Sequence, residues 1–108
     1  MNYSVLAIPP FDRQLKRLAK KYPSIKKEYA ELIGSLQQQP DQGTPLGNHC
    51  YKIRLAITSK GKGKSGGARV ITYVQVVHQS VYLLAIYDKA EQADIEDTDL
   101  KNLLKLIP

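Results

Sequence analysis

The chain has little of what several protein classes need. Its 108 residues include one cysteine, two histidines, one phenylalanine and no tryptophan. Cys50 alone cannot form an intramolecular disulfide, so it is expected to be a packed strand residue in a reducing compartment. His49 and His78 lie in different segments, and no Cys/His group has the spacing of a zinc site. We therefore expect no disulfide, no metal centre and no cofactor.

Long apolar runs are also missing. The longest, residues 81–87, is far below the roughly 20 residues that cross a bilayer. The apolar stretch at residues 5–8 ends at two prolines and is too short for a signal sequence. These features predict a cytoplasmic protein with no membrane partner.

Acidic residues are scarce relative to basic ones. Sixteen Lys and Arg face ten Asp and Glu, which gives a formal net charge of +6 and a pI near 9.5. Such a balance favours nucleic acid, an acidic protein or an anionic surface as partner. Charge alone does not choose among them.

The length fits one domain, residues 1–108. A short strand is expected at residues 3–8, ending at Pro9 and Pro10. Apolar residues then recur at helical spacing in two segments, and Pro23 suits the first turn of the second helix. Prolines and glycines predict a loop at residues 40–49. The two helical stripes are Phe11, Leu15, Leu18, Ala19 and Tyr22, and Ile25, Tyr29, Leu32, Ile33 and Leu36.

The second half reads as three strands and a helix. Residues 68–78 are apolar at both parities, which is typical of a central strand. Residues 81–87 pair back as a hairpin, and an acidic opening followed by a leucine stripe predicts a C-terminal helix. The order βααβββα indicates an α+β fold with a small mixed, largely antiparallel four-stranded sheet.

Candidate chemistry lies around the strand at residues 50–57. Its period of two puts Lys52 and Arg54 on one face and the apolar residues Ile53 and Leu55 on the other. A loop rich in lysine and glycine, residues 60–67, follows. Cations on a rigid sheet beside such a loop suit a polyanion better than a small apolar ligand.

The same loop is not a nucleotide-binding phosphate loop. A Walker A sequence needs a glycine where Thr58 stands, and here a strand follows where a helix should begin. Two interpretations stay open: the lysines hold phosphate without sequence preference, or the loop is a solvated hairpin tip. The lysines concerned are Lys60, Lys62 and Lys64.

Three segments, in this order and spacing, resemble the RelE/ParE superfamily of bacterial toxins, and within it the RelE/HigB-like mRNA interferases. They are LGNHCYKIR (46–54), KSGGARV (64–70) and LLAIYDK (83–89). The resemblance implies a small sheet flanked by helices, cleavage of mRNA on the ribosome and a cognate antitoxin. This sequence differs from the best-known RelE pattern in two ways: Arg54 stands where that pattern has a lysine, and the C-terminal helix contains no tyrosine.

The resemblance also implies site residues. Lys52 and Arg54 match paired cations of the family, Arg69 matches an arginine of the next strand, and Lys89 matches a basic residue after the last strand. RNA cleavage without metal requires a base for the 2′-hydroxyl, charge stabilisation at phosphate and an acid for the leaving oxygen. We assign Lys52 as base, Arg69 and Arg54 to phosphate, and Tyr87 to base stacking or proton donation.

Other interpretations remain for these residues. Lys52 and Arg54 can be solvated sheet residues, and Arg69 can form an ion pair with Asp88 or Glu91. The basic side of the first helix is either a solvated face or a surface that binds the phosphates of ribosomal RNA. It comprises Arg13, Lys16, Arg17, Lys20 and Lys21. Two alternative functions are a ParE-like DNA gyrase inhibitor without catalysis and an RNA-binding module without turnover.

Overall fold

The computed structural model describes residues 2–61 and 66–108. It contains β1 (Ser4–Ala7), α1 (Pro9–Lys21), α2 (Ile25–Gln38), β2 (Thr44–Gly47), β3 (Cys50–Leu55), the 3-10 turn η1 (Thr58–Lys60), β4 (Ala68–Gln75), β5 (Ser80–Asp88) and α3 (Asp97–Leu104). The α+β class and the order of the expected helices and strands are confirmed, with one strand added.

The strands form a single sheet in the order β1-β5-β4-β3-β2. β1 and β5 are parallel, and the other neighbouring pairs are antiparallel. The additional strand is β2, which lies inside the expected loop and pairs with the start of β3. Pro45 and the glycines around it had predicted a loop. Proline is tolerated in β2 because β2 is an edge strand. The four-stranded expectation is therefore corrected to five.

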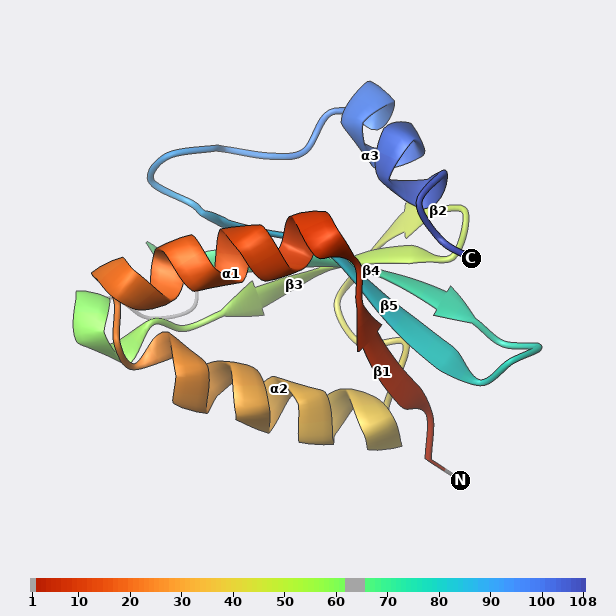
Figure 1. The fold of residues 1–108 in the computed structure, drawn as a ribbon, viewed down its shortest axis with the longest axis horizontal. Helices are drawn as coiled ribbons and strands as arrows, with labels where there is room; N and C mark the ends of the chain where they lie inside the picture. Colours follow the sequence, from red (N-terminus) through yellow and green to blue (C-terminus); the bar gives the residue numbers. More distant parts are fainter. Residues whose placement is uncertain (1, 62–65) are drawn as a thin grey trace.

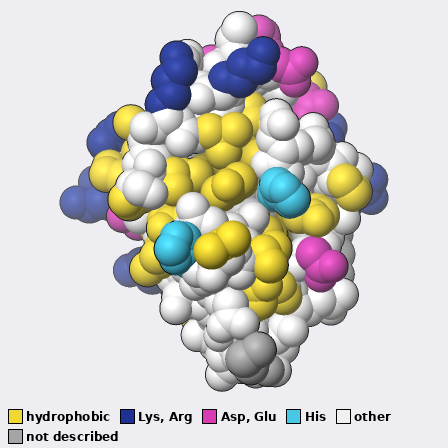
Figure 2. Space-filling view, turned by 90° about the vertical axis from the view of Figure 1, so that its right-hand side faces the viewer, with side chains coloured by type: hydrophobic (Ala, Val, Ile, Leu, Met, Phe, Trp, Pro, Cys, Tyr) yellow, Lys and Arg dark blue, Asp and Glu magenta, His cyan; other side chains and the backbone are white. Residues whose placement is uncertain are grey.

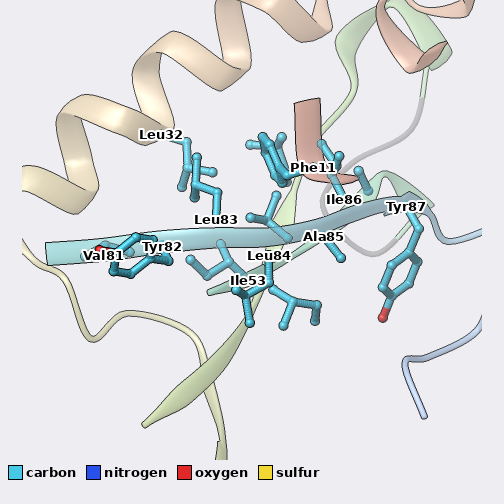
Figure 3. Packing of buried hydrophobic residues seen from close by; sticks show 14 of the residues in the cluster. Phe11, Leu32, Ile53, Val81, Tyr82, Leu83, Leu84, Ala85, Ile86 and Tyr87 are labelled. Carbon is cyan, nitrogen blue, oxygen red and sulfur yellow. The ribbon is translucent and has the colours of Figure 1, made fainter. Parts of the chain in front are cut away.

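The helices lie on opposite faces of the sheet (Figure 1). α1 and α2 cover one face, where Phe11 and Leu36 are fully buried. In Figure 3, Phe11, Leu32 and Leu83 lie on this side of β5, whereas Tyr87 points to the other side. α3 packs on that second face and buries Leu100. α3 covers only part of this face. The strand ends that carry Arg54 and Tyr87 lie beside the β5–α3 connection instead.

Two element boundaries differ from the sequence expectation. Helix α2 begins at Ile25 with Ser24 as its N-cap, so Pro23 precedes the helix. Strand β4 ends at Gln75, and Val76 and Val77 form the exposed turn before β5, 60% and 88% exposed. This apolar pair had predicted a longer strand, because hydrophobicity alone does not distinguish a buried strand residue from an apolar residue in an exposed turn.

Figure 2 shows the end of the molecule that carries this turn and the C-terminus. Hydrophobic side chains gather in the middle of this view, and Lys and Arg lie mainly at its margin. Among the described helices, none is both long and apolar enough to cross a membrane.

Candidate functional site

Three of the predicted residues form one row across the sheet. The antiparallel register places Arg54 of β3 opposite Arg69 of β4, and Arg69 opposite Tyr87 of β5. Directly opposed residues point to the same face, and neighbouring strands lie about 4.8 Å apart. Arg54, Arg69 and Tyr87 therefore begin side by side on the face opposite α1 and α2.

A second row runs next to the first. It consists of Lys52, Ile71 and Ala85, two residues along each strand. Lys52 thus shares the face of Arg54, as the alternation of β3 predicted. Lys89 follows the end of β5, is exposed, and donates from Nζ to the Ala93 carbonyl at 3.2 Å.

Gly67 fixes how the chain enters β4 before Arg69. A Cβ atom at Gly67 would lie 2.2 Å from the Leu55 carbonyl oxygen and 3.1 Å from the Ala56 Cα. The neighbouring atoms are backbone and cannot move aside cheaply, so the close approach of β4 to the end of β3 requires glycine here. The Gly67 carbonyl also accepts from the Lys89 amide at 3.0 Å, which ties the strand end of β5 to the same point.

Arg69 and Tyr87 are more buried than the sequence suggested, at 5% and 4% exposed. The Tyr87 hydroxyl is buried and makes no hydrogen bond of good geometry among the described residues, and the Asp94 carboxylate is near enough to act on it as an acceptor. Burial raises the pKa of Tyr87, the Asp94 carboxylate raises it further, and the Arg69 charge opposes them. The phenol therefore keeps its proton at neutral pH, as a general acid requires.

The structure adds a residue that the sequence argument did not select. Asp94 accepts a hydrogen bond from Lys52 Nζ at 3.3 Å, across 42 positions of the chain. A hydrogen bond from the Ile95 amide lowers the pKa of Asp94, burial opposes it, and the hydrogen bond from Lys52 and the charges of Lys52 and Lys89 lower the pKa further. Asp94 is thus an anion among the candidate cations. It lies in the β5–α3 connection, residues 89–96, which we call the strap.

Comparison with known proteins identifies the family of the chain. Residues 11–107 match the family model described as the RelE toxin of the RelE/RelB toxin–antitoxin system. The chain belongs to the RelE toxin family. The match spans all the strands of the candidate site and α3.

Solved RelE structures share the fold. A free-state arginine double mutant of E. coli toxin RelE has a TM-score of 0.63 at 17% identity, with both chains fully covered. The toxin–antitoxin complex RelBE2 from Mycobacterium tuberculosis gives 0.61 at 20% identity, covering 82% of this chain and 99% of the other. Isolated E. coli RelE toxin gives 0.51 at 16% identity, covering 97% and 99%. At these identities the likeness extends to the fold.

One predicted RNA contact of this RelE toxin, Lys60, lies in an ion pair in the structure. Lys60 does not project into solvent: its side chain is 11% exposed and forms an ion pair with the buried Asp88. Asp88 also accepts from the Tyr22 hydroxyl at 3.0 Å and the Ala90 amide at 3.0 Å. Although burial acts to raise it, these donors lower the pKa of Asp88. Lys60 therefore has a structural role, because its ammonium compensates a buried carboxylate.

The same contacts bear on the proposed ion pairs of Arg69. Asp88 lies opposite Ala68 in the register, so it points to the face of α1 and α2, away from the Arg54 row. Glu91 contacts Arg17 of α1 at 3.5 Å. Arg69 itself donates to the neighbouring Ala68 carbonyl at 3.1 Å. The two carboxylates thus have other cationic partners.

The remaining predicted residues lie apart from the row. Arg13, Lys16, Arg17 and Lys20 are exposed on α1, beyond the opposite face of the sheet. Lys62 and Lys64 fall outside the described residues. Tyr73 is half-buried and packs with Tyr82 at a ring-centroid distance of 6.5 Å. Within residues 2–61 and 66–108, no group of three or more His, Cys, Asp and Glu side chains is placed to hold a metal ion.

Proposed function

We propose that this chain is the toxin of a type II toxin–antitoxin pair and acts as a ribosome-dependent, metal-independent endoribonuclease that cleaves mRNA. The observation that carries the proposal is the row Arg54, Arg69 and Tyr87 on three adjacent strands, with Lys52 beside it. Two arginines and a lysine on one face of a rigid sheet can donate together to the oxygens of a phosphodiester.

In the proposed reaction the RNA supplies its own nucleophile. The 2′-oxygen attacks the adjacent phosphorus, the bond from phosphorus to the 5′-oxygen breaks, and a 2′,3′-cyclic phosphate and a 5′-hydroxyl result. Arg69 and Arg54 bind the phosphate oxygens, where their planar donors match developing charge. Tyr87 gives its proton to the leaving oxygen, in keeping with the raised pKa of its phenol.

Lys52 remains our candidate base, with a condition that the structure adds. Its ammonium is paired with Asp94. To accept the 2′-proton, Lys52 has to separate from Asp94 and lose its own proton. Lys89, exposed at the rim, is assigned to the neighbouring phosphate of the RNA.

We propose two macromolecular partners besides mRNA. Ribosomal RNA would contact exposed cations such as Arg13 and Lys16 on α1, and a cognate antitoxin would cover the cationic row. The family description and the RelBE2 complex support an antitoxin as the kind of partner. An antitoxin segment over Arg54 and Lys89 would block access of RNA to the same residues.

The experiment is primer extension on a defined mRNA in a translating extract, with and without the protein. New 5′ ends inside codons are expected, and they should vanish when the nucleotide before the cut carries a 2′-deoxy sugar. Unchanged transcripts on intact ribosomes would reject the activity. Cleavage that survives the 2′-deoxy substitution would reject the mechanism. RNA binding without new ends would instead indicate a binding module.

A further inference from the structure

The strap, residues 89–96, brings a carboxylate to the place where the proposed reaction needs a phosphate. Asp94 contacts Lys52 at 3.3 Å, and its charge also acts on Tyr87 and Lys89. These three side chains come from β3, from β5 and from the residue after β5. A single anion thus acts on three of the predicted site residues.

The strap also covers the proposed acid. The Tyr87 hydroxyl is buried, so in this conformation it cannot reach a leaving oxygen. Tyr87 and Ile95 line the same cavity of about 300 Å³ between α1, β5 and α3. Asp99 and Asn102 of α3 line the cavity as well. RNA cleavage by Tyr87 therefore requires the strap, with the start of α3, to move away from the sheet.

The contact that holds Asp94 to the sheet is weak. Asp94 is 61% exposed and Lys52 is 25% exposed, and ion pairs this accessible to water are screened and easily exchanged. The first part of the strap is anchored: the Lys89 amide donates to the Gly67 carbonyl at 3.0 Å, and Glu91 contacts Arg17 of α1 at 3.5 Å. Around Asp94 the other polar contacts are local: Gln92 donates to the Asp94 carbonyl at 2.9 Å, and the Ile95 amide donates to the Asp94 carboxylate at 2.9 Å. The part of the strap that carries Asp94 can therefore swing away from the strands while residues 89–91 stay in place.

We infer that Asp94 is an internal substitute for an RNA phosphate, and that the strap closes the site until a phosphodiester displaces Asp94 from Lys52. This inference rests on the proposed function, because it concerns regulation of the same site. Displacement frees the Lys52 ammonium and exposes the Tyr87 hydroxyl together. The closed state then has a cost for RNA binding that equals the strength of the contact between Lys52 and Asp94.

The test measures binding of a fluorescent 2′-O-methyl RNA oligonucleotide, which cannot be cleaved through its 2′-oxygen. Asp94→Asn keeps an oxygen for the Ile95 amide and removes the charge that faces Lys52. We expect it to bind the oligonucleotide about two- to fivefold more tightly than the unchanged protein, as the loss of one exposed ion pair predicts. Far-ultraviolet circular dichroism checks that the variant is folded.

Glu96→Gln is the matched control, because it removes the same charge two residues away from a side chain that makes no capping bond. Its affinity gain should be smaller than that of Asp94→Asn. In a Lys52→Met background, Asp94→Asn should give no gain beyond this control, since the cation that it releases is missing. A gain that persists without Lys52 would overturn the inference.

Arg69→Lys separates the inference from the proposed function. If Arg69→Lys binds the oligonucleotide as well as the unchanged protein, the cationic row is not the RNA site and the proposed function has failed. If Arg69→Lys weakens binding but Asp94→Asn matches Glu96→Gln, only the inference about the strap is wrong. Weaker binding by Asp94→Asn would also overturn it, and would make Asp94 a positioning residue for Lys52.

Discussion

Arg54 and Arg69 lie directly opposite each other in the register of β3 and β4. Two arginines at such a cross-strand pair repel each other, whereas most sheet neighbours are chosen for attraction or packing. In the proposed function both guanidinium groups bind one phosphodiester, and this leads to the first prediction.

Arg54→Gln should weaken RNA binding and leave the fold intact. Arg54 is an exposed strand residue, so its replacement should not lower the free energy of unfolding by more than about 0.5 kcal/mol. Urea denaturation gives this value, and anisotropy of a labelled RNA gives the affinity. A loss of stability would show that Arg54 is bound to a protein partner instead.

Tyr87→Phe should separate catalysis from stability. The hydroxyl is buried and makes no hydrogen bond of good geometry among the described residues, so its removal should leave stability unchanged or raise it by up to about 1 kcal/mol. If Tyr87 is the general acid, cleavage should fall by about 10²–10⁴-fold. Tyr73→Phe is the control on the same face and should cleave normally. Normal cleavage by Tyr87→Phe would remove Tyr87 from the mechanism.

Lys60→Met should reduce stability by about 3 kcal/mol, because it leaves the Asp88 carboxylate buried without its cation. The folded protein lowers the pKa of Asp88, so the stabilisation is present above the ordinary carboxyl range and is lost as pH falls through the lower folded value, below about pH 4. As the pH falls, Lys60→Met should begin to lose stability at a higher pH than the unchanged protein does.

Urea denaturation between pH 2 and pH 7 measures both effects of Lys60→Met. The matched control is Lys20→Met on the exposed side of α1, which should change stability by less than about 0.5 kcal/mol. If Lys60→Met is as stable as this control and binds RNA less well, Lys60 returns to the RNA-binding set.

Two glycine substitutions should act in opposite directions. Gly67→Ala places a Cβ against the Leu55 carbonyl and should cost about 1–3 kcal/mol, with reduced cleavage because the entry to Arg69 shifts. Gly34→Ala meets no atom within 4 Å on α2 and should stabilise by about 0.5–1 kcal/mol. Thermal unfolding compares them. An unaffected Gly67→Ala would show that the strand ends can separate freely.

The sequence was sufficient for one half of the site. Alternation along β3 placed Lys52 and Arg54 on one face, since a period of two is a local property. Alternation could not predict to which face of the sheet Arg69 points, because β4 is buried on both sides and has apolar residues at both odd and even positions. Its position beside Arg54 and Tyr87 became evident only from the register.

Contacts between distant segments could not be predicted. Asp94 appeared to belong to the acidic start of a helix, but α3 begins at Asp97, so Asp94 is in the strap and meets Lys52. The sequence predicted Lys60 to be a loop cation, but Lys60 forms an ion pair with the buried Asp88, 28 positions away along the chain. In both cases hydrophobic patterning carries no information about which charges meet.

The single-turnover rate of mRNA cleavage by Arg69→Lys, on saturating programmed ribosomes, tests the central claim most directly. This variant keeps the charge and loses the planar pair of donors to phosphate. If the row of Arg54, Arg69 and Tyr87 is the reaction centre, the rate should fall by about 10²–10³-fold with the unfolding midpoint nearly unchanged. A folded variant that cleaves within twofold of the unchanged protein would contradict the account.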